Sequence, residues 1–387
     1  MFGSRPRRGV ELMNEGYSRA EILERSGQLL AVADVDLDIE QGELFVIMGL
    51  SGSGKSTVIR MLNRLIEPTA GSVEIDGEGI EKLSDAELRS VRQRKLSMVF
   101  QHFALFPHRT VGENAAYGLK VQGIPEDERR ERAIRALETV GLGDRVDAYP
   151  SEMSGGMQQR VGLARGLATE ADILLMDEPF SALDPLIRRD MQDLLVELQD
   201  ELDRTIVFIT HDLNEAMRLG DRICVLKDGR VVQVGTGPEI IDNPANQYVA
   251  DFVTDVDRSR VLTAEQAMRH TRRTFTPDDS PRMVLDWLDE QEYNGVYVLD
   301  DERRILGVAR DDRLAAALNN GDPTIRDVLI EDYASARPYT YLSDLAQMAA
   351  HHTVPIAVVD DTGHLLGVVP RARLLASLSN VEGNVDA

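Results

Sequence analysis

The sequence predicts a large α/β domain with an inserted helical subdomain, followed by a smaller α+β module. A short apolar run, Glu43–Met48, leads into a glycine-rich loop and then into a helical pattern. Further apolar runs of strand length are separated by helical patterns, which is typical of α/β domains. Beyond about residue 260 the chain repeats itself with an offset of 60 residues. A chain of 387 residues is long enough for two or three domains.

The glycine-rich loop, Gly49–Thr57, reads G-L-S-G-S-G-K-S-T and fits the phosphate-binding pattern G-x-x-x-x-G-K-[ST]. Its glycines let backbone N–H groups approach phosphate oxygens, and the helix start adds free donors. We expect Lys55 to reach the β- and γ-phosphates and Ser56 to bind Mg²⁺. A chance match in a Gly/Ser-rich turn is the alternative, which the flanking strand and helix disfavour. The candidate binding residues in this loop are Gly49, Ser51, Gly52, Ser53, Gly54, Lys55, Ser56 and Thr57.

The composition limits the class of protein. The formal net charge of −23 at pH 7 argues against nucleic-acid binding, which requires a basic face. No apolar run approaches the roughly 20 residues that cross a bilayer, and no signal-peptide pattern is present. We therefore expect a soluble protein, which can still dock on a membrane partner. The single cysteine, Cys224, lies in an apolar run and is expected to be a small buried side chain.

The segments around the phosphate loop are predicted from caps, alternation and turns. Ser18–Glu21 forms a capping box that opens a short helix, which ends near Gly27. Val32–Ile39 alternates apolar and polar residues and is expected to be a half-buried strand. After the loop helix, Ser72–Gly77 predicts an antiparallel strand pair. Ser84–Glu87 caps the next helix.

A helical subdomain is predicted at about residues 102–170. The apolar strand Leu96–Phe100 precedes it and ends at Gln101, whose side chain either reaches a metal or its water, or only ends the strand. From His102 the pattern becomes helical, with a capping box at Thr110–Glu113 and an amphipathic helix at Glu126–Val140.

A second glycine-rich segment, Ser154–Arg160, opens the last helix of this subdomain. Ser154 is a good N-cap, and Gly155 and Gly156 expose N–H groups at the positive end of the helix. This arrangement predicts a second anion site. An ordinary glycine-rich cap is the alternative.

Two polar strand ends complete the candidate site. The buried strand Ile173–Met176 is followed by Asp177, expected to hold Mg²⁺ through water, and Glu178, placed to orient or deprotonate a water. A solvated turn is the alternative. Thr205–Thr210 is a further buried strand with His211 at its end. A single histidine is usually structural, but this one leaves the sheet edge where open α/β sheets bind ligands. The remaining predicted elements are a helix to about Leu202, a hairpin at 222–234, and helices at 238–241 and 247–253.

A polar stretch near residues 254–262 predicts a linker, and the repeat follows it. Val298–Asp301 matches Val358–Asp361, and Leu306–Val308 matches Leu366–Val368. Each copy is expected to form strand, acidic turn, strand, glycine and helix. Two copies this small would bury their apolar faces against each other. We assign residues 1–253 to the first domain, 263–322 to the first repeat, and 323–387 to the second repeat and tail.

The set of motifs resembles that of ATP-binding cassette (ABC) ATPases. The resemblance implies that two domains pair head to tail, with ATP between the phosphate loop of one and Ser154–Gln158 of the other. It implies that Glu178 is the catalytic base, His211 contacts the γ-phosphate and Gln101 senses it. It also implies that Asp184 lies at the dimer seam and that Phe2 stacks on adenine. The further nucleotide-binding residues are thus Phe2, Ser154, Gly155, Gly156, Gln158 and Asp184, and the metal ligands are Ser56, Gln101 and Asp177.

Three stretches resemble one branch of this family, the ATPases of glycine betaine/proline importers. They are Leu83–Gln101, a helix at Gly9–Ser26, and Ala182–Ile187. The C-terminal repeat resembles the tandem cystathionine-β-synthase-type (CBS) pair of those subunits. In CBS repeats that bind nucleotides, a Ser/Thr and an Asp hold the ribose. Here those places are taken by Arg310 and Arg313, and by Pro370 and Arg373, which weakens the expectation of adenosine binding.

The resemblance implies a homodimeric ATPase, with ATP and Mg²⁺ as cofactors, that energises the import of compatible solutes. Such a subunit is peripheral to the cytoplasmic face of the membrane. It binds integral-membrane permease subunits and works indirectly with an extracytoplasmic solute-binding protein. An importer for another small solute is one alternative, because the partners choose the solute. A soluble ABC ATPase outside transport is the other, disfavoured by the single cassette and the acidic surface.

Overall fold

The computed structural model describes all residues except 102–103, 182, 203, 255, 272, 292 and 380–387. At residues 200–202 it describes the backbone but not the side chains. The chain divides into two compact units, Met1–Asp255 and Val256–Ala387, which are described separately below. His102, the first residue of the predicted helical subdomain, and the tail from 380 lie outside the described residues. Leu262, in the stretch predicted as a linker, is buried in the core of the second unit.

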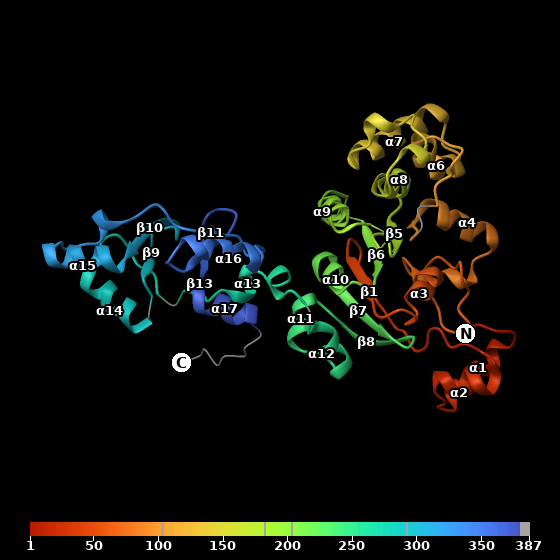
Figure 1. Ribbon diagram of the computed structural model, residues 1–387, viewed down its shortest axis with the longest axis horizontal. Coiled ribbons are helices and arrows are strands. Elements are labelled where there is room, and N and C mark those ends of the chain that lie inside the picture. The colour runs from red at the N-terminus through yellow and green to blue at the C-terminus, as the bar shows by residue number, and fades with distance from the viewer. Residues whose placement is uncertain are drawn as a thin grey trace. The chain divides into compact units, whose positions relative to one another are not determined.

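A six-stranded sheet organises the first unit, in the order β4-β5-β6-β1-β7-β8 (Figure 1). The first five strands in this order are parallel, and β8 pairs antiparallel with β7. The predicted α/β fold is therefore confirmed. The strands are β1 (Leu44–Met48), β4 (Leu96–Val99), β5 (Ile173–Asp177), β6 (Thr205–Thr210), β7 (Arg222–Lys227) and β8 (Arg230–Gly235).

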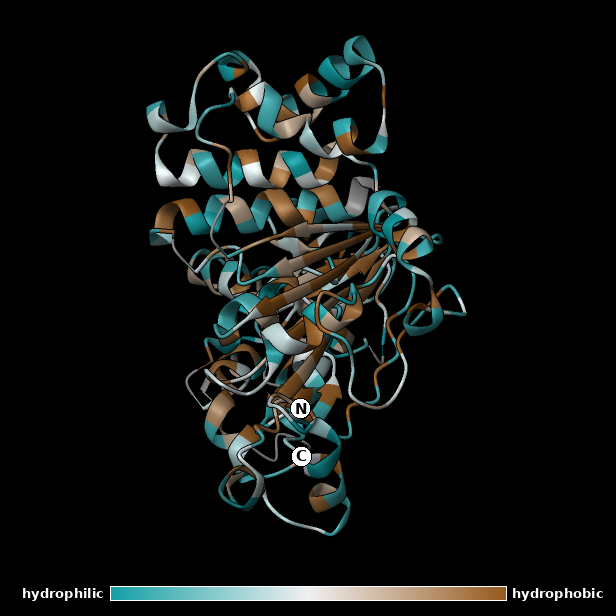
Figure 2. Ribbon diagram, turned by 90° about the vertical axis from the view of Figure 1, so that its right-hand side faces the viewer, coloured by the Kyte–Doolittle hydropathy of each residue, from teal (hydrophilic) through white to brown (hydrophobic). Residues whose placement is uncertain are grey.

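The central strands are buried on both faces, because helices cover the sheet from two sides. Figure 1 shows α3 (Lys55–Leu62) on one side of the sheet and α10 (Leu213–Leu219) on the other. Every residue of β1 and β6 is buried, and their uninterrupted apolar runs are typical of parallel strands. In Figure 2 these strands are brown, while the surrounding helices carry both brown and teal faces. Cys224 is buried in this core, as predicted.

The helical group between β4 and β5 contains α5 (Val111–Ala115), α6 (Tyr117–Gln122), α7 (Glu126–Thr139) and α8 (Gly155–Ala168). Figure 1 shows α6, α7 and α8 gathered beyond the edge of the sheet. The predicted capping boxes at Ser18, Ser84 and Thr110 are confirmed, each with its glutamate three residues later. The short hairpin predicted after the loop helix is also confirmed, as β2 (Glu74–Ile75) and β3 (Glu78–Gly79).

Two predictions for the N-terminal segment are wrong. The helix expected at Gly9–Ser26 is two helices, α1 (Pro6–Asn14) and α2 (Arg19–Ser26), because Gly16 adopts φ +90° and Ser18 caps a new helix. Val32–Ile39 forms no strand, although its apolar side chains pack on the core of the sheet. Asp34 has φ +49° and breaks the extended backbone, so the alternation buries one face without strand pairing.

Three further predicted helices of the first unit are confirmed, and the short helices η1, η2 and η3 were not predicted. The helix after Asp184 runs to Leu202, and two short helices close the unit. These elements are η1 (Ile80–Lys82), α4 (Asp85–Arg94), η2 (Gly143–Arg145), η3 (Pro150–Glu152), α9 (Pro185–Leu202), α11 (Gly237–Asp242) and α12 (Gln247–Val253).

The second unit contains two copies of a strand–strand–helix pattern. A shared apolar cluster joins the copies, with Tyr297 and Val308 from the first and Ala357 and Val368 from the second. The glycine of each copy lies inside the second strand, not after it. The elements are η4 (Arg258–Arg260), α13 (Ala264–Ala267), α14 (Pro281–Gln291), β9 (Gly295–Leu299), β10 (Ile305–Arg310), α15 (Asp311–Asn320), η5 (Arg326–Val328), β11 (Ser335–Ala336), α16 (Leu342–His351), β12 (Ile356–Val359), β13 (Leu365–Val369) and α17 (Arg371–Ser379). Within the described part of the chain, no helix has the length and apolar character needed to cross a membrane.

Asn114 holds the loop that enters the helical group, which gives a test of this packing. Its buried amide accepts from Phe106 N at 2.7 Å and donates to three backbone carbonyls, those of Phe106, Arg109 and Thr110. We expect Asn114→Ala to lower the free energy of unfolding by about 2–3 kcal/mol, because buried backbone groups lose their partners. Urea denaturation followed by circular dichroism measures the loss.

The control is Asn214→Ala, which truncates an exposed amide on α10. It should stay within about 0.5 kcal/mol of the unmodified chain. Equal denaturation midpoints for the two variants would contradict the role given to Asn114.

Candidate functional site

The phosphate loop follows β1 and begins α3, and its glycines are sterically required. Gly49 has φ +150°, and a Cβ there would lie 2.2 Å from the carbonyl oxygen of Leu226. Gly54, the N-cap of α3, has φ +104°, a conformation that L residues rarely adopt. Strand, loop and helix thus occur in the order that the motif needs.

Lys55 is buried at the base of this loop. Its ammonium donates to the carbonyl oxygens of Gly49 at 2.7 Å and Leu50 at 3.2 Å, and lies 3.9 Å from Glu178 Oε1. Burial lowers the pKa of Lys55, and the carboxylates of Glu178 and Asp177 act in the opposite direction. A buried cation held by loop carbonyls can be transferred to phosphate oxygens without a large movement.

Ser56 and Asp177 face each other across the boundary between α3 and β5. Ser56 Oγ donates to Asp177 Oδ1 at 2.9 Å, and Asp177 is almost fully buried. The other carboxylate oxygen accepts from Arg60 Nη2 at 3.1 Å. A hydroxyl beside a carboxylate supplies the hard oxygen ligands that Mg²⁺ prefers, so these residues fit the ion. The described residues contain no cluster of three or more His, Cys, Asp or Glu side chains able to hold a metal by themselves.

Glu178 connects the polar ends of three strands. Its Oε2 lies 3.0 Å from His211 Nδ1 and 3.5 Å from the amide nitrogen of Gln101. Its backbone has φ +46°, in the left-handed region, and is held there by a hydrogen bond from its N–H to Ile209 O at 3.1 Å. Such conformations of non-glycine residues cost free energy and concentrate at functional sites.

The strand register explains why these side chains meet. Asp177 pairs with Ile209, and Met48 pairs with Thr210, so β5, β6 and β1 end at the same level. The residues that follow each strand therefore emerge together at the carboxyl edge of the sheet, where open α/β sheets bind ligands. The structure brings together four of the predicted groups at this edge: Lys55, Gln101, Asp177–Glu178 and His211.

The second glycine-rich segment lies elsewhere in the unit. Ser154 caps α8 by accepting from Met157 N at 3.3 Å, and Gln158 donates to the carbonyl oxygens of Pro150 and Met153. Figure 1 shows α8 apart from α3, and hence from the phosphate loop. Gly156 faces the start of α9, because a Cβ at that position would lie 2.6 Å from Ile187 Cγ2.

The two remaining predicted residues have local structural partners. Asp184 begins α9, and its Oδ1 accepts from the N–H groups of Leu186 and Ile187. Phe2 exchanges two backbone hydrogen bonds with Leu29, both of 2.8 Å, which leaves its side chain 40% exposed. Neither residue makes a described hydrogen bond to Glu178 or to its neighbours Lys55, Gln101 and His211.

Besides Arg60, two other residues near the site were not found from the sequence. Arg19 of α2 donates to the carbonyl oxygen of Gly52 at 3.1 Å. Glu215 of α10 is buried, and its carboxylate accepts from the hydroxyl of Thr210, the residue before His211, at 2.6 Å. Burial raises the pKa of Glu215. An acid in the first turn after the N-cap Asp212 looks like ordinary helix capping, so the sequence carried no separate signal for it.

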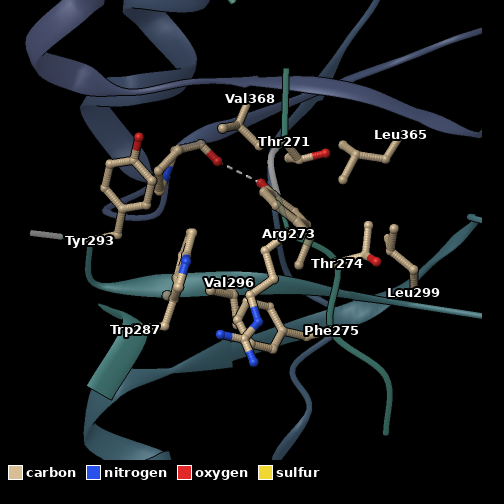
Figure 3. A pocket seen from close by; sticks show the side chains of 13 residues that line it. Thr271, Arg273, Thr274, Phe275, Trp287, Tyr293, Val296, Leu299, Leu365 and Val368 are labelled. Atoms are coloured by element: carbon tan, nitrogen blue, oxygen red, sulfur yellow. Dashed lines mark hydrogen bonds between the residues drawn. The ribbon is translucent and has the colours of Figure 1, made fainter. Parts of the chain in front are cut away.

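The second unit has a narrow aromatic hollow of about 30 Å³ that is partly open to solvent. Figure 3 shows Trp287 and Tyr293 on one side of it, Leu365 and Val368 of the second repeat, and Arg273 and Phe275 between the two groups. Phe275, Trp287 and Tyr293 pack edge to face, with ring centroids 5.3 and 5.9 Å apart. The described residues that line the hollow are therefore mostly apolar, and Arg273 is the only cation among them.

Comparisons with known proteins relate both units to described families. The profile described as ABC transporter matches residues 32–181, and the profile described as CBS domain matches residues 325–380. The part of the chain that carries the phosphate loop is thus similar to ABC transporters, and the second repeat is similar to CBS domains.

Relatives match over nearly the whole chain. A glycine betaine/proline betaine transport system ATP-binding protein of Salmonella typhimurium is 50% identical over 387 residues, covering 99% of this chain and 96% of the relative. A glycine betaine transport ATP-binding protein of Bacillus subtilis is 47% identical over 389 residues, covering 100% and 92%. A trimethylamine N-oxide transport system ATP-binding protein of Ruegeria pomeroyi is 51% identical over 264 residues, covering 68% and 77%.

A solved structure supports the same relation for the first unit. It is the dimeric, post-hydrolysis state of an ATP-binding cassette bound to ADP and Pi. Its sequence is 40% identical, its TM-score is 0.50, and the match covers 53% of this chain and 90% of that chain.

The buried carboxylate of Glu215 predicts a pH dependence of stability. Because its pKa is raised, the folded state holds this proton more tightly than the unfolded state does. Its contribution to stability is therefore present at low pH and is lost as pH rises through the raised pKa. Glu215→Gln removes the titration. We expect the free energy of unfolding of the unmodified chain, relative to the variant, to increase as pH falls from about 8 to about 5.

Paired urea denaturation curves across this pH range measure the difference. A difference that stays constant, or that shrinks as pH falls, would contradict the raised pKa.

Proposed function

The chain belongs to the ATP-binding proteins of glycine betaine-type ABC transporters, and on that premise we propose that it hydrolyses ATP to drive import of glycine betaine, proline and related compatible solutes. One observation carries the proposal for this chain's own residues. The carboxylate of Glu178 lies within 3.0 Å of His211 and 3.9 Å of buried Lys55, at the edge that follows the phosphate loop.

In this proposal Glu178 is the general base. It accepts a proton from the attacking water, while Lys55 holds the β- and γ-phosphate oxygens. His211 shares a hydrogen bond with Glu178 Oε2 and keeps the carboxylate oriented toward the site of attack. Gln101, 3.5 Å from the same oxygen, is positioned to sense whether the γ-phosphate is present.

Mg²⁺ is the proposed metal cofactor, held by Ser56, by Asp177 through water and by Gln101. When bound, it neutralises charge on the phosphate oxygens. The short contact between Ser56 Oγ and Asp177 Oδ1 places two hard ligands together beside the phosphate loop. Arg60, which now donates to Asp177, would have to share or release that carboxylate.

ATP is proposed to join two copies of the chain. The start of α8 offers free backbone N–H groups, as helix N-termini do, yet it lies away from the phosphate loop of its own chain. In the proposed homodimer, Ser154, Gly155, Gly156 and Gln158 of one copy would bind the nucleotide held by the other. The related cassette described above is a dimer bound to ADP and Pi, which supports this arrangement. Asp184 would lie at the seam, and exposed Phe2 would stack on adenine.

The proposed place of work is the cytoplasmic face of the membrane, where the chain binds integral-membrane permease subunits. The segment Gln101–Thr110, between the catalytic edge and the helical group, is the proposed permease contact. An extracytoplasmic solute-binding protein would act indirectly through the permease, and no nucleic acid is involved. The names of the transport-system relatives support this assignment.

Import of another small methylamine is the second candidate. The trimethylamine N-oxide relative is 51% identical over 264 residues, and the two betaine relatives are 47% and 50% identical over nearly the whole chain. An ATP-binding subunit does not itself select the solute. Uptake of labelled betaine and labelled trimethylamine N-oxide, in a strain lacking this chain and in its parent, distinguishes the two.

The second unit is proposed to regulate the ATPase as a tandem CBS module, with repeats at 263–322 and 323–387. The profile match at 325–380 and the shared apolar cluster between the copies support a paired module. The ligand or ionic signal that it reads is proposed to act on the assembled transporter.

Glu178→Gln tests the assignment of the base. We expect this variant to bind ATP with nearly unchanged affinity and to lose at least about 100-fold in turnover, because it loses the group that accepts the proton. Phosphate release measures turnover, and a fluorescent ATP analogue measures binding. The control, Glu197→Gln, changes an exposed glutamate on α9 and should leave turnover unchanged. Near-normal hydrolysis by Glu178→Gln would refute the assignment.

The same variant reports on pairing. With hydrolysis stopped, ATP should hold Glu178→Gln as a dimer in size-exclusion chromatography with light scattering. Adding Ser154→Arg places a bulky side chain at the exposed start of α8 and should return the protein to monomers. Dimers that persist with Ser154→Arg, or that never form with ATP, would count against the shared site.

Removal of the second unit tests regulation. A chain ending at residue 255, reconstituted with its permease, should retain ATP-driven uptake but lose the dependence of uptake on ionic strength. The full chain in the same vesicles is the control. Equal salt dependence with and without residues 256–387 would rule out this role.

A further inference from the structure

We infer that Arg19, on helix α2, is a positioning residue for the phosphate loop, and that the N-terminal helix pair raises the affinity of the site for ATP. The inference rests on the proposed nucleotide site and adds a residue to it. Arg19 lies inside the capping box Ser18–Glu21 but takes no part in it, and no motif in the sequence gives it a role at the phosphate loop.

The contact lies at the tip of the loop. Arg19 Nη1 donates to the carbonyl oxygen of Gly52 at 3.1 Å and lies 3.8 Å from Asp228 Oδ1, in the turn between β7 and β8. The arginine side chain is 31% exposed. The guanidinium therefore bridges the phosphate loop and the hairpin turn from outside the loop.

Gly52 has few other restraints. Its φ is +79°, and a Cβ built there would meet no atom within 4 Å. A glycine with open space on its Cβ side loses much conformational freedom when a ligand orders it. Among the described contacts, the hydrogen bond from Arg19 is thus the one that fixes the orientation of the Gly52–Ser53 peptide group from outside the loop.

Peptide geometry transmits the restraint to the inner side of the loop. A trans peptide is planar, and its C=O and N–H point in opposite directions. When Arg19 holds the Gly52 carbonyl outward, the N–H of Ser53 is held inward, where it donates to Leu50 O at 3.1 Å across the loop. The loop is kept in a compact turn before any phosphate arrives.

The next peptide group is held by the same part of the chain. Gly229 N donates to the carbonyl oxygen of Ser53 at 2.9 Å, and Ala33 N donates to Gly229 O at 2.8 Å. A Cβ on either Gly54 or Gly229 would lie 2.5 Å from the carbonyl oxygen of Ala31. The segment Ala31–Ala33, which follows α2, therefore packs directly against the loop and the hairpin turn. The contact of Arg19 with Gly52 is a further connection between this part of the chain and the loop.

Helix α2 is rigid enough to act as the support. A complete capping box at Ser18 begins it, and Gly27 with φ +67° ends it. Ile22 is fully buried in a small cluster with Leu12 and Leu30. Arg25, on the same helix, stacks over the ring of Tyr17 at 4.1 Å. Its described contact is therefore with a residue just before α2, and not with the phosphate loop.

This geometry predicts an effect on binding and not on the chemical step. Arg19 touches neither Glu178 nor His211 through a described hydrogen bond, so its loss leaves the base and its partner in place. A loop that is already ordered pays less conformational entropy when it closes on phosphates. Removal of the restraint should therefore raise KM and the dissociation constant for ATP and leave kcat nearly unchanged.

The test compares four full-length proteins: the unmodified chain, Arg19→Ala, Arg19→Lys and the matched control Arg25→Ala. Titration with a fluorescent ATP analogue gives the dissociation constant, phosphate release gives kcat and KM, and thermal denaturation without nucleotide gives Tm. We expect Arg19→Ala to weaken ATP binding about tenfold, the size of one charge-assisted hydrogen bond, with kcat within twofold. Arg19→Lys keeps one donor and the charge and should recover part of the loss, and Arg25→Ala should bind ATP normally.

Unchanged ATP affinity in Arg19→Ala would overturn the inference. So would equal losses of affinity in Arg19→Ala and Arg25→Ala that track equal falls in Tm, because the effect would then come from destabilisation of the helix. If the unmodified chain itself failed to bind ATP, the proposed function would fail, which is distinguishable from both of these results.

Discussion

The parallel register of four strands is the constraint on which the site depends. Because β4, β5, β6 and β1 end at one edge, residues separated by more than 100 positions in sequence emerge side by side. Asp177 can accept from Ser56, and Glu178 can contact both Lys55 and His211, only while this register holds. A slip of one residue would turn each side chain to the opposite face of the sheet. The buried apolar core beneath the edge therefore has a direct functional role, because it locks the register.

The same edge concentrates features that oppose stability. Glu178 has a left-handed backbone, Lys55 is a buried cation, and Glu215 is a buried carboxyl whose pKa is raised. Each is unfavourable alone, and each is held by a partner outside its own helix or strand. Strand β6 supplies Ile209 for Glu178 and Thr210 for Glu215, and carbonyl oxygens of the phosphate loop hold Lys55. Unfavourable local features that persist in a well-packed core indicate that the geometry has a use, which here is the placement of charge before a nucleotide binds.

The sequence predicted the parts of this arrangement that depend on local pattern. Uninterrupted apolar runs located the buried strands, and capping boxes located helix starts to the residue. Alternation at Val32–Ile39 misled, because it reports that one face is buried and not whether a neighbouring strand is available to pair. Arg19 and Glu215 were missed for a related reason. Their partners, Gly52 and Thr210, are a loop carbonyl and a hydroxyl that any donor or acceptor could use, so no spacing in the sequence marks the contact.

The distribution of contacts separates two roles within the first unit. The phosphate loop is supported by three parts of its own chain. It follows β1, it accepts a hydrogen bond from Gly229 in the hairpin turn, and it accepts another from Arg19 of α2. The start of α8 is different. Among the described contacts, the hydrogen bonds of Ser154 and Gln158 stay within residues 150–158, and Figure 1 shows α8 apart from α3. In the proposed homodimer, the phosphate loop would be the half of the site that its own chain already supports, and the start of α8 would be supplied by the second copy. Preorganisation of the loop would then favour nucleotide binding before the second copy closes, because less conformational entropy is lost on binding.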